Sequence, residues 1–292
     1  MARIDARWSR RRVLSIMAAS AALPLAGSAG KAAAAVEPYR WQGIVLGAEA
    51  DLTLYAASRG EAAAAIDAAL AEVARLEAVF SLHQPDSALA RLNRDGLLMT
   101  PPSELRALLA QALTLSELSG GRFDPTIQPL WTLIAGHFAQ AGADPAGPPA
   151  AALAAARAKV DYRALSVGAE RIAFARPGMQ VSLNGIAQGY ITDRVAELLQ
   201  ARGFGPALVN LGEMRALGRK PDGAGWSIGL AAPGASEQVV EEIEIAGGAV
   251  ATSAARGLLF DAAGRFTHII DPTNLACAAR DGAAPGLAPT AA

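Results

Sequence analysis

The segment from Met179 to Gly203 constrains the fold of this chain more than any other. Its first three residues have the character of a short strand, and residues 191–202 repeat apolar side chains at helical spacing. Asn184 is a favourable N-cap, and Gly203 lies where a helix commonly ends. A strand that enters a helix through glycines leaves N–H groups at the positive end of the helix dipole, which suits a phosphate or pyrophosphate. The alternative is a helix start in which the glycines only allow tight packing, and this segment alone leaves both interpretations open.

The amino terminus has the layout of an export signal. Arg10, Arg11 and Arg12 precede a mildly apolar, alanine-rich run from residue 15 to residue 25, and small residues follow. The run is too short and too weakly apolar to span a membrane comfortably, although a buried N-terminal helix is an alternative. We therefore predict that residues 1–35 are a signal peptide of the twin-arginine type. The mature protein is expected in the periplasm, where it could lie peripherally on the inner membrane, with no transmembrane segment.

Composition excludes several classes of function. The 292 residues carry a formal net charge of −1, so nothing in the overall charge favours nucleic acid as a partner. The three histidines and one cysteine argue against a zinc site built from these residue types. Cys277 has no partner for a disulfide within the chain.

Helix and strand patterns are mixed along the chain without regular alternation. Residues 61–79 and 102–118 have apolar residues at helical spacing, and residues 39–47 and 50–56 have the pattern of a strand pair. Further strands are expected near residues 207–212, 226–230, 243–245 and 266–270. These patterns predict the α+β class, with a sheet packed by helices.

Four polar clusters lie in loops at the ends of the predicted elements, where functional sites commonly occur. They are His83 with Asp86, residues 123–126, residues 184–189, and Thr252-Ser253 with His268 and Asp271. Each alone has a structural explanation, because Asp-Pro pairs suit turns and His268 on an apolar strand suits a hydrogen-bonded core histidine. The sequence contains no Walker lysine motif, dinucleotide fingerprint, zinc-protease motif or hydrolase elbow.

In this order, however, the clusters resemble the ApbE family, the FAD:protein FMN transferases. The resemblance covers about residues 41–272, and several motifs in a fixed order are far more specific than one. The matching segments are Phe80-Ser81-x-x-x-Pro85-Asp86-Ser87 with Leu92-Asn93, Gly120-Gly121-x-Phe123-Asp124-Pro125-Thr126, Leu183-x-Gly185-Ile186-Ala187-x-Gly189-Tyr190-x-x-Asp193-Arg194, Leu208-Val209-Asn210-Leu211-Gly212, Ala251-Thr252-Ser253, and His268-Ile269-Ile270-Asp271-Pro272. The segment around Asn184 and the export signal are similar to the NosX-like branch of the family.

This resemblance implies a single ApbE-like, T-fold-like domain in residues 36–272, with a mixed sheet. It also implies an enzyme that uses FAD and Mg²⁺ and transfers FMN to a Thr or Ser in the flavinylation motif of an acceptor flavoprotein, with release of AMP. The implied catalytic base is His268, and the Ala187 carbonyl is the implied metal ligand. The implied cofactor-binding residues are His83, Phe123, Asp124, Asn184, Gly185, Ala187, Gly189, Asp193, Ser253 and Asp271.

The sequence also departs from the family pattern. His83 stands where an aromatic tyrosine is common, and Ser182, Asn184, Gln188 and Ala254 replace the common Asp, Gly, Lys and Gly. Family members usually continue past the Asp-Pro pair to an Asp-Ala-x-x-Thr helix start, which supplies metal ligands, whereas the match here stops at Pro272.

We therefore expect residues 273–292 to be a disordered, non-matching tail of a truncated or frame-shifted chain. The loss of a carboxylate should weaken Mg²⁺ binding. An FAD-binding protein without transferase activity is thus an alternative function, and an exported solute-binding or scaffold protein is a second one.

Overall fold

A six-stranded antiparallel sheet forms the centre of the protein in the computed structural model, which describes residues 36–232, 235–254, 257–278 and 283–291. The strand order is β1-β2-β6-β7-β10-β11. These strands are β1 (Glu37–Val45), β2 (Ala48–Ala56), β6 (Ala207–Asn210), β7 (Met214–Leu217), β10 (Gly248–Ala254) and β11 (Ala283–Ala288). The predicted signal peptide, residues 1–35, lies outside the described residues.

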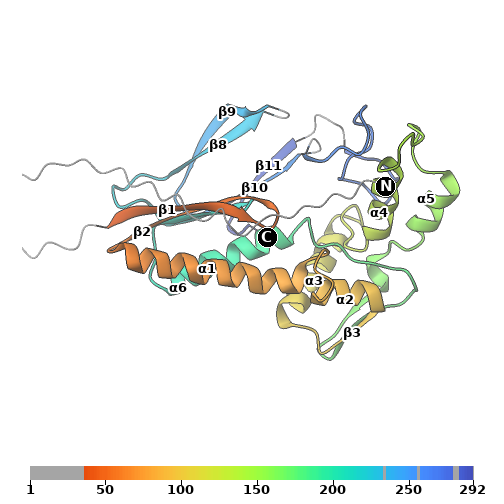
Figure 1. Cartoon of the computed structure of the whole chain (residues 1–292), viewed down its shortest axis with the longest axis horizontal. Coiled ribbons are helices and arrows are strands. Elements are labelled where there is room, and N and C mark those ends of the chain that lie inside the picture. The colour runs from red at the N-terminus through yellow and green to blue at the C-terminus, as the bar shows by residue number, and fades with distance from the viewer. Residues whose placement is uncertain (1–35, 233–234, 255–256, 279–282, 292) are drawn as a thin grey trace, which may run out of the picture.

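Helices α1 (Arg59–Phe80) and α6 (Ala187–Ala201) pack against one face of this sheet, as Figure 1 shows. Leu52 and Leu54 of β2 point into this layer, where they join Leu76 and Val195 in the main core. Alternation along β2 turns Tyr55 to the other face, where its ring lies 6.2 Å from that of Trp226. The hairpin of β8 (Trp226–Ala232) and β9 (Ala235–Ile245) therefore touches that second face at Trp226, its first residue.

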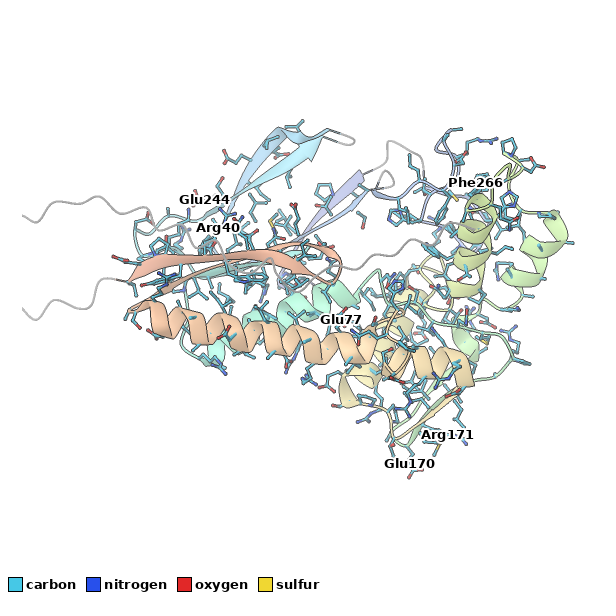
Figure 2. The ribbon with its side chains drawn as sticks, viewed as in Figure 1. Arg40, Glu77, Glu170, Arg171, Glu244 and Phe266 are labelled. Atoms are coloured by element: carbon cyan, nitrogen blue, oxygen red, sulfur yellow. The ribbon has the colours of Figure 1, made fainter. Side chains whose placement is uncertain are left out.

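The remaining elements extend the molecule at one end of α1. They are α2 (Ala88–Asp95), β3 (Leu97–Met99), α3 (Ser103–Leu118), α4 (Gln128–Phe138), α5 (Ala150–Arg157), the 3₁₀ turn η1 (Tyr162–Ala164), β4 (Leu165–Val167) and β5 (Arg171–Phe174). A small second core of Leu130, Ile134, Val160 and Ile270 joins α4 and α5 to the segment after residue 257. In Figure 2, Phe266 lies beside α4, far from Glu170 and Arg171 at the outer end of the β3–β5 pair.

The α+β class and the packing of a sheet by helices are confirmed. The predicted strand pair forms β1 and β2, and the predicted helix at residues 61–79 forms α1, whose N-cap Ser58 accepts a hydrogen bond from the Glu61 N–H. The strands of the six-stranded sheet are all antiparallel, and the one parallel bridge among the described residues joins Ile127 and Gln180. Within the described residues, no helix is both long enough and apolar enough to cross a bilayer.

Two predicted elements differ from the structure. Residues 266–270 do not form a strand; they contribute only single bridges, such as the one between Leu259 and Thr267. Conversely, the segment predicted as a disordered tail contains β11, which pairs along six residues of β10. Backbone pairing at a sheet edge requires no alternation of apolar side chains, so this strand has no such pattern in its sequence.

Candidate functional site

The turn at the start of α6 positions its backbone N–H groups in a different way from that predicted. The Leu183 carbonyl accepts hydrogen bonds from the N–H groups of Ile186 (2.9 Å) and Ala187 (2.7 Å), so the helix begins at Ala187. Asn184 is therefore not the N-cap, a prediction that was wrong because this carbonyl closes the turn one residue earlier. At the other end, Gly203 follows the helix with φ +90°, as its predicted place at the helix end requires.

Three N–H groups at this helix start have no protein acceptor among the residues that the structure describes. They belong to Gly185, Gln188 and Gly189. Asn184 and Gly185 are exposed, so the turn faces solvent, whereas Gly189 is buried on the inner side of α6. Unbonded N–H groups at the positive end of a helix dipole are suited to hold an anionic group.

Phe123 lies directly beside this turn. A Cβ atom added to Gly185 would come 3.4 Å from Cε2 of the Phe123 ring, so the ring and the turn are in contact range. The Pro125 carbonyl accepts the Ser182 N–H at 2.8 Å and joins the two segments again. Two segments that are about sixty residues apart in sequence, and that the sequence analysis singled out separately, therefore lie side by side.

Asp124 organises the loop that carries Phe123. Its Oδ1 accepts hydrogen bonds from the Thr126 N–H (2.8 Å) and hydroxyl (2.6 Å), and its Oδ2 accepts the Tyr162 N–H at 3.0 Å. The carboxylate is buried, at 8% exposure, and uses both oxygens within the protein. Asp124 therefore fixes the loop to the first residue of η1, which is a structural role in addition to its predicted contact with the cofactor.

The β6–β7 turn lies on the other side of the α6 start. Gln188 Nε2 donates to the Leu211 carbonyl at 2.5 Å, and its side chain fills the space beside Gly212, which has φ +102°. A Cβ atom on Gly212 would lie 1.9 Å from Gln188 Nε2. The glycine at this position thus permits both the turn and the close approach of Gln188.

Glu213, in the same turn, reaches the end of β10. Its Oε2 accepts the Thr252 N–H at 3.2 Å. Burial raises the pKa of this half-buried carboxyl, and the Thr252 N–H acts in the opposite direction. Glu213 directly follows the Asn210-Leu211-Gly212 motif but was not among the predicted site residues. Through this contact, the α6 start is connected to the strand that carries the exposed Ser253.

His268 lies in the irregular segment that follows residue 257. Its N–H and its ring Nδ1 lie 3.1 and 3.2 Å from the Leu258 carbonyl, so Nδ1 carries the proton in the neutral ring. Among the described residues, Nε2 has no hydrogen-bond partner, and it can accept a proton. The backbone therefore selects a tautomer that suits a base.

Asp271, three residues further, stabilises the next turn. Its Oδ1 accepts hydrogen bonds from the Thr273 N–H (2.8 Å) and hydroxyl (2.6 Å), and these bonds lower the pKa of Asp271. Arg122 Nε lies 3.9 Å from its Oδ2. Arg122 directly precedes Phe123, so this weak ion pair links the His268 segment to the loop beside the α6 start.

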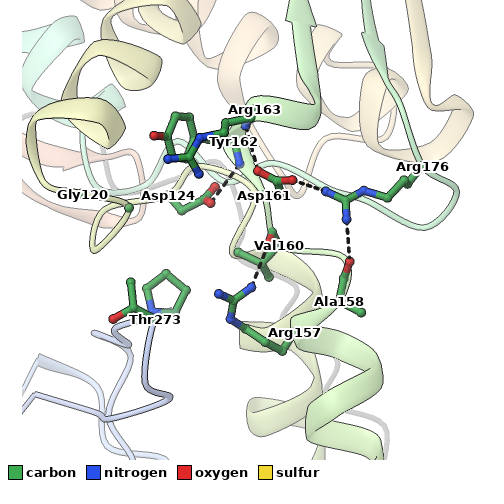
Figure 3. A pocket seen from close by; sticks show the side chains of 12 residues that line it. Gly120, Asp124, Arg157, Ala158, Val160, Asp161, Tyr162, Arg163, Arg176 and Thr273 are labelled. Atoms are coloured by element: carbon green, nitrogen blue, oxygen red, sulfur yellow. Dashed lines mark hydrogen bonds and ion pairs between the residues drawn. The ribbon is translucent and has the colours of Figure 1, made fainter.

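A basic pocket of about 350 Å³ opens beside the same loop (Figure 3). Arg157, Arg163 and Arg176 line it together with Tyr162, and in Figure 3 Thr273 faces Arg157 across it. Arg176 forms an ion pair with Asp161 at 2.5 Å, whereas Arg157, among the residues that the structure describes, donates only to the Val160 carbonyl. Of the predicted site residues, all of which are described, Asp124 alone lines this pocket.

The other predicted residues lie further from this group. His83 is exposed in the loop after α1, where its N–H donates to the Ser81 hydroxyl. Asp193 is buried in α6, accepts the Ala291 N–H with both oxygens at 2.8 and 2.9 Å, and lies 3.4 Å from Arg215 Nε. These contacts give Asp193 a role in holding the chain after β11 against the helix.

The described residues do not fit the implied magnesium site. Within this part of the chain, no group of three or more His, Cys, Asp or Glu residues is placed to hold a metal ion. Ala187 is the first residue of α6, so the helical hydrogen-bond pattern directs its carbonyl toward the N–H of Ile191. A carbonyl used in this way is a poor primary ligand for a cation that requires several oxygen ligands in octahedral geometry.

Comparison with known proteins gives consistent similarities. The model of the ApbE family matches residues 46–284. An FAD:protein FMN transferase of Treponema pallidum is 35% identical over 237 residues, which are 72% of this chain and 64% of the relative, and one of Vibrio cholerae is 32% identical, over 66% and 59%. The chain thus spans less than two thirds of the length of these relatives.

Two solved structures have a similar fold. The apo form of the Pseudomonas stutzeri flavinyl transferase ApbE superposes with a TM-score of 0.68 at 29% identity and covers 82% of this chain and 75% of that one. The ApbE protein of Thermotoga maritima superposes with a TM-score of 0.75 at 25% identity, with coverages of 87% and 83%. The same fold therefore extends over most of each chain.

Proposed function

Because this chain belongs to the ApbE family, we propose that it is an FAD:protein FMN transferase. In this reaction a Thr or Ser hydroxyl of an acceptor protein attacks the phosphorus of the FMN part of FAD. A new P–O bond forms to the hydroxyl oxygen, the anhydride P–O bond breaks, and AMP leaves. The relatives in Treponema and Vibrio bear the name of this activity.

The observation that carries the proposal is the contact between Phe123 and the α6 start. An aromatic ring can pack against the flavin or adenine ring, and the N–H groups of Gly185, Gln188 and Gly189 lie at the adjacent helix start. FAD combines flat rings with a pyrophosphate, so it requires these two kinds of contact next to each other. We assign the pyrophosphate to the exposed turn at Asn184 and Gly185.

We assign the role of general base to His268. The Leu258 carbonyl fixes the proton on Nδ1, which leaves Nε2 to take the proton of the acceptor hydroxyl as the new P–O bond forms. Ser253 and Asp271 are proposed to support the loops around the acceptor. His83 is proposed to lie along the flavin and Asp193 to hold α6 in position.

We derive no catalytic step through Mg²⁺, because the described residues supply no fitting set of ligands. The unbonded N–H groups of the α6 start can stabilise negative charge on the pyrophosphate oxygens in the transition state. The positive charges of Arg157 and Arg163 at the nearby pocket also favour negative charge on these oxygens.

The test uses the purified chain with FAD and an exported flavoprotein domain as acceptor. Liberated AMP is quantified by chromatography, and covalent FMN on the acceptor is detected by its fluorescence in a denaturing gel and by its mass. We expect both products, and we expect His268→Ala to reduce covalent FMN at least about a hundredfold, as the removal of a general base commonly does. Absence of AMP and of FMN transfer, with the chain folded and FAD bound, would reject the activity.

We also propose that the twin-arginine-type sequence exports the chain to the periplasm, so that the acceptor is an exported protein. The motif at Arg10 to Arg12 supports this location. Replacement of these three arginines by lysine should leave the protein in the cytoplasmic fraction, whereas the control Arg3→Lys with Arg7→Lys should not. Equal periplasmic amounts of both variants would contradict this route.

A further inference from the structure

Strand β11 covers the edge of β10 that leads to the candidate site. The two strands pair antiparallel over Ala249–Ala254 and Ala283–Ala288, which puts Ser253 opposite Ala284 and Thr252 opposite Pro285 (Figure 1). Without β11, the outward N–H and C=O groups of β10 would form an open edge. Such an edge is a template for another extended segment.

Little apolar surface holds β11 in place. Its sequence, Ala-Ala-Pro-Gly-Leu-Ala, is composed of residues that are mostly depleted in strands. The side chains from Ala284 to Ala288 are exposed, and Leu287 is 66% exposed. The strand therefore depends mainly on backbone hydrogen bonds, whose net contributions are about 1 kcal/mol each. Another segment that offers the same backbone bonds and also buries side chains would replace it.

Pro285 prevents a new strand from adding outside β11. The Thr252 N–H points toward Glu213 on the β7 side, so antiparallel alternation directs the backbone of the opposite residue, Pro285, away from β10. Proline has no N–H to offer at this outward position, which blocks the outer edge. An incoming extended segment would therefore have to take the place of β11.

This edge is continuous with the candidate site. Glu213 holds the Thr252 N–H, and its turn contacts Gln188 at the α6 start through the Leu211 carbonyl. Ser253 is the next residue on β10, and its backbone faces β11 rather than β7. A segment paired with this part of β10 would thus pass directly beside Ser253, which is proposed to support the loops around the acceptor.

We propose that the β10 edge is the docking site of an extended segment of the acceptor protein, which displaces β11 and presents its Thr or Ser hydroxyl to the candidate site. This inference rests on the proposed transferase function. Recognition would depend on main-chain hydrogen bonds, with specificity from alternate side chains. The contact of Ala291 with Asp193 would keep the displaced strand near the edge, ready to return after transfer.

A reversible disulfide tests this proposal. Val250 and Leu287 are opposite each other and form a non-hydrogen-bonded pair, the closer of the two pair types, so cysteines at both positions can bridge β10 and β11. The variant Val250→Cys with Leu287→Cys also carries Cys277→Ser, to leave a single thiol pair. A matched control on the opposite edge of the sheet, Arg40→Cys with Thr53→Cys and Cys277→Ser, bridges β1 and β2.

The substrate is a pool of synthetic twelve-residue peptides, each with one central Thr or Ser, and covalent FMN is read by mass. We expect the oxidised β10–β11 variant to transfer FMN at least about tenfold more slowly than the same protein after reduction, while FAD binding and the slow release of AMP to water stay unchanged. The β1–β2 control should transfer equally in both states.

Equal transfer by the oxidised and reduced β10–β11 variant would overturn the proposal. So would failure of the unmodified chain to modify any peptide of the pool while it transfers FMN to a folded acceptor domain. Loss of AMP release and of transfer in every form, including the unmodified chain, would instead reject the proposed transferase function.

Discussion

The Glu213 carboxylate accepts the Thr252 N–H at 3.2 Å, and this bond joins the β6–β7 turn to the end of β10. The backbone pairing of β7 with β10 ends at Val250 opposite Met214. Beyond that point, the Glu213 carboxylate accepts the hydrogen bond that a backbone carbonyl would accept within a sheet. Glu213 thereby connects the segment that holds the α6 start with the segment that carries Ser253. Its protonation state should therefore affect both.

The first prediction concerns the pH dependence of stability. Burial raises the pKa of Glu213 in the folded state, so the folded protein binds this proton more tightly than the unfolded chain. The stabilisation that this bound proton gives to the folded state is fully present below the unfolded pKa of glutamate, near 4.3. It is lost as the pH rises through the higher pKa of the folded state. The melting temperature of Glu213→Gln minus that of the unmodified chain should therefore be more positive at pH 7.5 than at pH 4, because glutamine stays neutral at both pH values.

Differential scanning fluorimetry at the two pH values measures this effect. The control is Glu77→Gln, which removes a carboxylate of α1 outside this contact, and its change in melting temperature between the two pH values should be smaller than that of Glu213→Gln. A Glu213→Gln difference that stays constant would contradict the assignment of the raised pKa to this residue.

The second prediction concerns Gly212. Alanine there adds the cost of a positive φ, about 1 kcal/mol, and forces Gln188 out of its contact with the Leu211 carbonyl. Gly223→Ala is the matched control, because Gly223 also has a positive φ, +86°, but no atom lies within 4 Å of the added Cβ. In urea unfolding, Gly212→Ala should lose about 1 kcal/mol more than Gly223→Ala, the usual net value of a hydrogen bond. Equal losses would mean that Gln188 moves without cost.

The third prediction concerns Asp124. Asparagine keeps one acceptor oxygen but turns an NH₂ group toward another donor, either the Thr126 or the Tyr162 N–H, so one buried hydrogen bond is replaced by a donor–donor contact. We expect a loss of about 1–3 kcal/mol in urea unfolding, the cost of an unsatisfied buried group. The exposed Asp95→Asn, whose partner is the neighbouring Arg94, should change stability by less than about 0.5 kcal/mol. If Asp124→Asn also changes the free energy of unfolding by less than about 0.5 kcal/mol, the carboxylate does not stabilise the loop.

Local pattern was sufficient to predict much of the fold. Apolar spacing located α1, and alternation located β2, because each element buries one continuous face against the same core. The start of α6 could not be placed to the residue, since the competition between Asn184 and the Leu183 carbonyl is decided by the path of the chain and not by N-cap preference. β11 could not be found at all, because a strand whose side chains from Ala284 to Ala288 are exposed leaves no pattern in the sequence.

The site was predictable to a similar degree. The motifs around Phe123 and Gly185 were found separately, but their contact depends on the Pro125–Ser182 hydrogen bond, which no sequence spacing indicates. Glu213 was missed because a single glutamate after a glycine matches no sequence motif that would indicate a functional role. Its role comes from Thr252, which lies thirty-nine positions further along the chain. The arginines of the basic pocket are likewise brought together only by folding.

The last prediction addresses the ring that we assign to FAD binding. Phe123→Leu preserves most of the apolar volume against the main core but removes the flat surface beside Gly185. An aromatic pair contributes about 0.5–1.5 kcal/mol beyond its buried area, so the dissociation constant for FAD should rise by a factor of about two to ten. Flavin fluorescence titration measures it, with Phe138→Leu in the second core as the control, because that ring packs against His137 and Phe266 instead. If the two variants bind FAD equally well, the flavin or adenine ring does not pack on Phe123, and the cofactor must be assigned to another part of the site.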